Sequence, residues 1–139
     1  MTNGSKNIGF FSEFVYSDYQ DSWLENTCEL IIGLDYKFEN NLYLLGQYYY
    51  HQLPLNQLDS NHLIMLRAEK PFAYFHNWEL NLISDLQEGM TLIRPKLIFS
   101  LKEGLDLETG AVIKVNPQKE SSLNQLNQEL IYLSLSKYF

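Results

Sequence analysis

The residues best suited to chemistry are three histidines, His51, His62 and His76, and the carboxylates around them. A hydrolase needs a nucleophile, a base and an orienting acid in one place, and zinc or iron sites need ligands at short, regular spacings. The histidines have neither arrangement in the sequence. We therefore expect them to be surface or interface residues and expect no catalytic site, no cofactor and no metal. A membrane hydrolase that uses His51 or His62 is kept as a third hypothesis.

The remaining charged residues alternate with apolar ones. In the segment 28–38, Glu29, Asp35 and Lys37 occupy odd positions, whereas the even positions are apolar or aromatic after the cysteine. A period of two places every second side chain on one face of a strand. We expect the charged faces to meet inside a barrel and to pair, because an isolated buried ion is costly. The expected lumen charge network consists of Glu13, Glu29, Asp35, Lys37, Arg67, Glu69, Glu79, Asp85, Arg94, Lys96, Asp106, Glu108 and Lys114. It either plugs the barrel as a structural network or lines a narrow pore or ion site.

The elements that position these residues are eight predicted strands. Alternation places them at residues 7–17, 28–39, 42–52, 62–70, 78–86, 91–102, 105–115 and 128–139. Short turns at 39–41, 102–104 and 71–77 alternate with the longer segments 18–27, 53–61 and 116–127, which is typical of membrane barrels. Only the segment 87–90 is short where a long loop is expected. The fold class predicted is an all-β, eight-stranded antiparallel up-and-down transmembrane β-barrel.

Two features depart from regular alternation. Pro95 lacks a backbone donor, so it predicts a bulge or a local break in its strand. The leucines between 123 and 133 have a spacing of three and four that also fits the start of a short helix; alternation from residue 131 onward favours a loop followed by a strand. Glycines at 33, 46 and 110 lie within predicted strands, where they relieve crowding in a curved sheet.

Composition limits the alternatives further. The chain has 139 residues and 45% hydrophobic content, which suits a single domain over 1–139. A net charge of −7 without a basic patch argues against nucleic acid. Cys28 is the only cysteine, so no internal disulfide organises the fold. The sequence contains no run of 18 apolar residues, so we expect no transmembrane helix. The first ten residues lack the apolar core that a signal peptide requires.

The direction of the apolar face separates two interpretations. Turned inward, it gives a soluble up-and-down β-barrel that binds an apolar ligand, as in lipocalins. Turned outward, it contacts a bilayer, and aromatic residues are then expected at both membrane interfaces. One expected rim contains Phe38, Tyr43, Phe72, Tyr74, Phe75, Trp78, Tyr138 and Phe139, and the other contains Tyr16, Tyr19, Trp23, Tyr48, Tyr49 and Tyr50. These two groups favour the membrane.

Five runs combine alternating strands with short turns: GFFSEFVY, ELIIGLDYKFENNLYLLGQYYYH, NWELNLISDLQEG, LIRPKLIFSLKEGLDLETGAVI and LIYLSLSKYF. Through these runs nearly the whole chain resembles the C-terminal half of larger, porin-like bacterial outer-membrane β-barrel proteins. The resemblance implies an integral protein of the bacterial outer membrane without enzymatic activity, a scaffold or narrow pore, and an excised or engineered piece of a larger barrel. Its implied partners are the lipid bilayer or detergent and the barrel-assembly machinery, and it is expected as a monomer or homodimer. Ile131, Leu133, Leu135 and Phe139 resemble the terminal assembly signal of such proteins, from which Lys137 departs.

Overall fold

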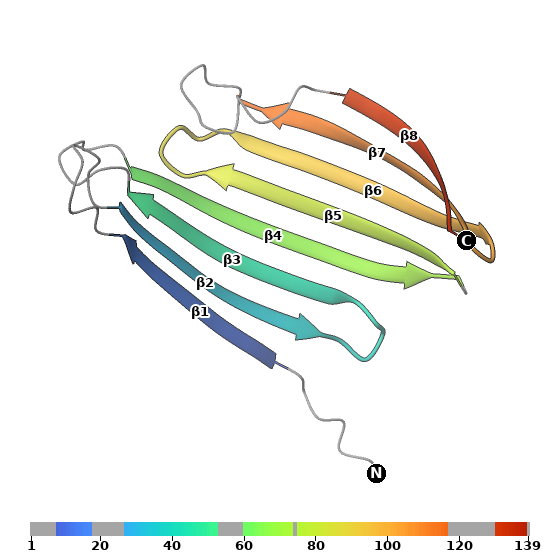
Figure 1. The fold of residues 1–139 in the computed structure, drawn as a ribbon, viewed down its shortest axis with the longest axis horizontal. Helices are drawn as coiled ribbons and strands as arrows, with labels where there is room; N and C mark the ends of the chain where they lie inside the picture. Colours follow the sequence, from blue (N-terminus) through green and yellow to red (C-terminus); the bar gives the residue numbers. More distant parts are fainter. Residues whose placement is uncertain (1–7, 18–26, 53–59, 74, 117–129, 139) are drawn as a thin grey trace, which may run out of the picture.

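The computed structural model describes residues 8–17, 27–52, 60–73, 75–116 and 130–138, which form one antiparallel sheet of eight strands. Each strand pairs with its neighbours in the sequence, so the order across the sheet is β1 to β8 (Figure 1). The strands are β1 (Ile8–Ser17), β2 (Thr27–Lys37), β3 (Tyr43–Gln52), β4 (Ser60–Phe72), β5 (His76–Asp85), β6 (Thr91–Lys102), β7 (Leu105–Val115) and β8 (Leu130–Lys137). The prediction of eight up-and-down strands is confirmed. Of the leucines that also fit the start of a short helix, Leu130 and Leu133 lie in strand β8, whereas residues 123 and 126 lie outside the described residues.

The tight turns follow from residues that tolerate unusual backbone angles. Between β2 and β3, Asn41 has a φ of 63° and the amide of Phe38 donates to the carbonyl of Leu42 at 2.8 Å. Asn favours the left-handed region more than most residues do. Between β6 and β7, Gly104 has a φ of 69°. A Cβ added to Gly104 would lie 2.7 Å from the backbone oxygen of Tyr138, so both the backbone angle and the close approach require glycine.

The short segment between β5 and β6 is a turn closed by Asp85. One carboxylate oxygen of Asp85 accepts hydrogen bonds from the amides of Gln87 at 3.0 Å and Glu88 at 3.1 Å. The carbonyl of Asp85 accepts a further bond from Gly89, whose φ is 68°. An aspartate that bonds the backbone two and three residues ahead stabilises a tight turn. This local chemistry explains why the connection is short.

Of the two expectations at Pro95, a bulge or a local break, the structure has a local break in the ladder and no bulge. Strand β6 is continuous, and Pro95 pairs with Leu80 of β5 in normal register. On the β7 side the ladder omits Arg94 and Pro95 and then resumes in the same register, because proline has no amide hydrogen to donate. The register shift lies instead between Ser100 and Lys102, near the end of the strand. Proline therefore interrupts the ladder without displacing the strand.

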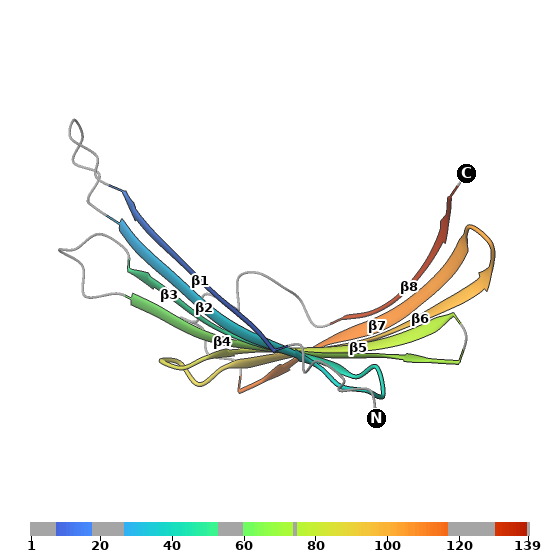
Figure 2. The same cartoon turned by 90° about the horizontal axis from the view of Figure 1, so that it is seen from below.

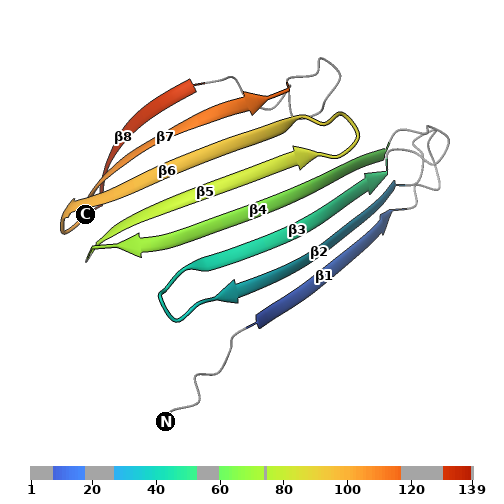
Figure 3. The same cartoon turned by 180° about the vertical axis from the view of Figure 1, so that it is seen from behind.

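The sheet is strongly curved and open. Seen edge on, it forms a trough in which β1 and β8 rise on the two sides (Figure 2), and the view from behind shows the same strand order (Figure 3). Within the described residues β1 pairs only with β2, and β8 only with β7. The eight described strands therefore form an open sheet, and the expected closed barrel is not observed in them. In the same part of the chain, no helix has the length and apolar character needed to cross a bilayer.

Candidate functional site

The strand register divides the side chains into two faces of different chemistry. Paired residues share a face, so Glu29, His51 and Asn61 lie on one side of the sheet, together with every residue in register with them. All thirteen charged residues expected in the lumen lie on this side, which we call the polar face. In the described strands, the opposite apolar face has only three charged residues, which are Lys70, Lys102 and Lys137. All three lie at the same end of the sheet, where β4, β6 and β8 finish.

The distribution of buried residues identifies the polar face as the concave face of the trough. Side chains on a concave surface converge and shield one another, whereas those on the convex surface spread apart. Every buried residue of the described strands lies on the polar face: Gly33, Glu79, Asp85, Leu92 and Val112. The apolar face contains most of the exposed large hydrophobic residues. If the curvature continued to a closed ring, charged side chains would line the inside and apolar side chains would cover the outside.

A ladder of ion pairs runs across the middle of the polar face. Arg67 of β4 contacts Glu69 at 2.6 Å and Glu79 of β5 at 3.2 Å. Lys96 of β6 lies 3.3 Å from Glu79 and 4.0 Å from Glu108 of β7. Glu79 is only 8% exposed and is the centre of this ion-pair ladder. Its two basic partners compensate the cost of removing its charge from water.

The ladder continues to β8 because Gly110 of β7 has no side chain and leaves space for Tyr132 of β8. Tyr132 donates a hydrogen bond to Glu108 at 3.0 Å, and its hydroxyl lies over Gly110. A Cβ at position 110 would come within 2.6 Å of that hydroxyl and 2.9 Å of the carbonyl oxygen of Pro95. At the other side of the sheet, the ring of Phe11 in β1 occupies the space over Gly33 of β2 in the same manner. Of the glycines that the sequence marked as relieving crowding, Gly110 and Gly33 do so, whereas a Cβ at Gly46 would make only an ordinary contact of 3.5 Å with Leu66.

The other expected network residues share the polar face but lie outside the ladder. Glu29 contacts His51 at 3.1 Å, Asp85 closes the β5–β6 turn, and Asp106 accepts a hydrogen bond from Ser100 at 2.7 Å. The remaining five are Glu13, Asp35, Lys37, Arg94 and Lys114. The structure thus joins five of the thirteen into one chain of contacts and places the rest around it on the same face.

One part of the polar face is apolar, and the alternation of charges did not predict it. Met90, Leu92 and Val112 are buried, and Leu63 and Ile83 pack against them. Met90 lies in the turn, so no strand periodicity indicates its burial. This apolar cluster covers the part of the polar face next to the β5–β6 turn.

The apolar face has aromatic contacts at both ends. At one end, the ring of His76 lies 5.6 Å from that of Phe72 and 5.3 Å from that of Phe99. At the other end, the hydroxyl of Tyr48 lies 2.6 Å from Nδ1 of His62, beside the ring of Tyr50. Aromatic residues with a polar atom suit the boundary between an apolar and an aqueous phase. The expected rim residues Tyr19, Trp23, Tyr74 and Phe139 lie outside the described residues.

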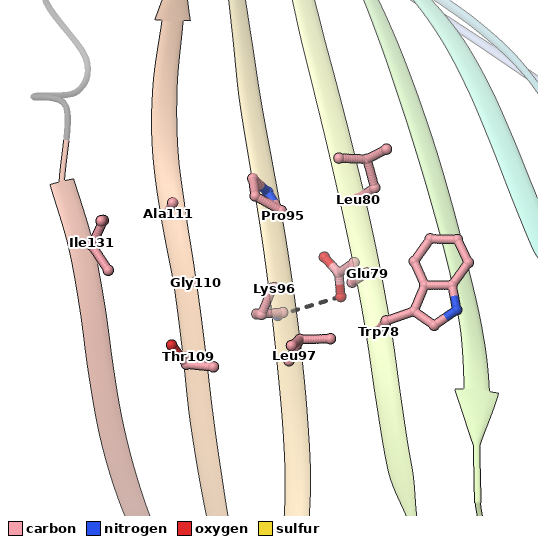
Figure 4. A pocket seen from close by; sticks show the side chains of 10 residues that line it. All are labelled: Trp78, Glu79, Leu80, Pro95, Lys96, Leu97, Thr109, Gly110, Ala111 and Ile131. Atoms are coloured by element: carbon pink, nitrogen blue, oxygen red, sulfur yellow. Dashed lines mark ion pairs between the residues drawn. The ribbon is translucent and has the colours of Figure 1, made fainter.

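A shallow groove of about 510 Å³ crosses the apolar face over β5 to β8 (Figure 4). It exists because Pro95 and Ala111, both small, lie between the larger Leu80 and Ile131. The same figure shows the Lys96–Glu79 ion pair, which belongs to the ladder on the other face. The groove is therefore an uneven part of an exposed apolar surface.

The histidines do not share a site. By register His51 lies on the polar face and His62 on the apolar face, so they are separated by the sheet. In the described ranges no group of three or more His, Cys, Asp or Glu residues is placed to hold a metal ion.

Of the terminal residues that resemble an assembly signal, Ile131, Leu133 and Leu135 are 87%, 73% and 63% exposed on the apolar face of β8, and Phe139 lies outside the described residues.

Comparisons of the chain with models of protein families, with characterised proteins and with solved structures give no match.

Proposed function

We propose that this chain forms a bacterial outer-membrane β-barrel wall without enzymatic activity, acting as a scaffold or a narrow pore. One observation carries the proposal: in the described strands thirteen charged residues lie on the concave face, and the only charged residues on the convex face are three lysines, all at one end. A membrane barrel needs this distribution, with an apolar band outside and polar groups inside. The sequence resemblance to porin-like proteins supports the bacterial outer membrane as the location.

The curvature favours the membrane barrel over the soluble alternative. A soluble barrel that binds an apolar ligand must enclose its apolar side chains. Here Phe10, Phe14 and Ile131 are between 65% and 87% exposed on the convex face. An exposed apolar surface of this extent on a monomer marks contact with lipid or with another protein.

The height of the apolar face supports the same proposal. On β4 this face extends from His62 to Phe72, with Leu66 between them. Strands rise about 3.3 Å per residue, so this stretch is roughly 33 Å long. A tilt of about 40°, usual in membrane barrels, reduces its height to roughly 25 Å, the height of their apolar band. Lys70, near the end of this stretch, can extend its ammonium to the headgroups.

The polar face favours cations if the lumen conducts. In the described strands this face has eight carboxylates and five basic groups. Carboxylates that line a pore attract cations and repel anions. The Glu79 ladder neutralises part of this charge, so a modest preference for cations is expected.

Folding in detergent tests the proposal. The unfolded chain is diluted into detergent micelles and, separately, into buffer without detergent. We expect β-type circular dichroism and heat-modifiable gel migration in micelles only, because the apolar face needs a lipid-like environment. A stable, folded monomer in buffer with saturable binding of a lipophilic dye would instead establish the soluble barrel.

A further inference from the structure

We propose that the outer edges of β1 and β8, which pair with no further strand within the described part of the chain, are an interface for a second copy of this chain, and that two copies close one ring of sixteen strands. This inference rests on the proposed membrane function. In a bilayer an unpaired strand edge leaves backbone amides and carbonyls without partners, so the two edges must be paired. Each edge extends over a whole strand, Ile8–Ser17 on one side and Leu130–Lys137 on the other.

The direction of the two edge strands suits a copy in the same orientation. An even number of up-and-down strands makes β1 and β8 antiparallel to each other. Strand β1 of one copy can therefore pair with β8 of the other as an ordinary antiparallel ladder. A two-fold axis along the barrel then relates two identical β1–β8 seams, and no edge remains free.

The chemistry of the two edges also matches. On the apolar face β1 presents Phe10 and Phe14, and β8 presents Leu133 and Leu135, all of them more than 60% exposed. Pairing with the faces aligned continues the outer apolar band across the seam.

The shape of the sheet favours a second copy over closure within one chain. In Figure 2, β1 and β8 lie at opposite sides of the trough, and both rise toward its open side. All extensive contacts among the described strands are between sequence neighbours, and β1 and β8 have no such contact with each other. A second copy, placed with its concave face toward the first, can reach both edges without further bending of either sheet.

A wider ring changes what the barrel can do. Eight strands give an interior that side chains fill, whereas sixteen-stranded barrels leave an aqueous channel. The ion-pair ladder and the Met90 cluster would then coat the wall of a water-filled lumen. The proposed pore, rather than a plugged scaffold, is the functional consequence.

Crosslinking across the seam tests the proposal. Glu13 and Ser134 are exposed on the polar face near the middle of β1 and β8. In a Cys28→Ser background, a Glu13→Cys chain and a differently tagged Ser134→Cys chain are folded together in micelles and treated with a short bismaleimide. We expect a crosslinked heterodimer. In the control, a Gln47→Cys chain takes the place of the Glu13→Cys chain. Gln47 lies on the same face but in β3, two strands from the edge, so we expect no crosslinked product with the Ser134→Cys chain.

Two further measurements keep the result decisive. The molar mass of the unmodified protein in detergent is measured by light scattering, and we expect the protein part to have twice the mass of one 16.3 kDa chain. A chain with both cysteines is expected to crosslink to a copy. Crosslinking within one chain, or a folded protein of single mass, overturns the inference and leaves the proposed membrane barrel intact. Assemblies of more than two copies also overturn it, and failure to fold in micelles refutes the proposed function itself.

Discussion

A lysine placed in the middle of the apolar face gives the sharpest test of which face meets lipid. Leu66 lies in β4, four residues from His62 and six from Phe72, and its side chain is 50% exposed. Near the bilayer midplane, Lys or Arg on the lipid face of a barrel costs about 2–4 kcal/mol. For Leu66→Lys we therefore expect the unfolding equilibrium constant to rise roughly 30- to 700-fold, since about 1.4 kcal/mol corresponds to a factor of ten.

The neighbouring residue supplies the control. Met65 is 36% exposed on the polar face at the same height. Because carboxylates outnumber basic groups on that face, Met65→Lys is expected to change stability by no more than about 0.5 kcal/mol, as at an ordinary surface site. Both variants are unfolded with urea from lipid vesicles and followed by the fluorescence of Trp78, which lies on the apolar face. Equal effects of the two substitutions, or a larger effect at Met65, would refute the assignment of the faces.

Three further predictions address the ion-pair ladder, the glycines and the lumen. Glu79→Ala leaves Arg67 and Lys96 without their shared, buried partner and is expected to cost about 2 kcal/mol in urea unfolding, whereas Glu108→Ala, at a contact of 4.0 Å, is expected to cost less than about 1 kcal/mol. Gly110→Ala forces a Cβ to within 2.6 Å of a tyrosine hydroxyl and is expected to cost about 1–3 kcal/mol; Gly46→Ala, the control, changes stability little, and equal effects would contradict the close approach. In planar bilayers under a KCl gradient, the reversal potential is expected to indicate a cation preference, and an anion preference would contradict the charge assignment of the lumen.

The sequence determined the strands and their faces. Charges that occur only at odd positions of a segment, as Glu29, Asp35 and Lys37 do, indicate both a strand and its polar face, because the side-chain period of a strand is two. A shift of one residue would move every charge to the apolar face, so this pattern also fixes the register. The short turns were readable for the same local reason, since Asn41 and Gly104 supply the backbone angles that the turns need.

Only the tertiary structure decided which charges pair and which face is concave. Arg67, Glu79 and Lys96 are far apart in the sequence, and their contacts depend on strand pairing and curvature. Pro95 shows the limit of local reasoning: its missing donor predicts a bulge or a local break, and only the pairing with β5 and β7 shows that the β7 ladder is interrupted while the register is kept. Burial of Met90 depends on the packing of Leu92 and Val112 beneath it. Curvature, which sets the width of any ring, is a property of the whole sheet rather than of any one strand.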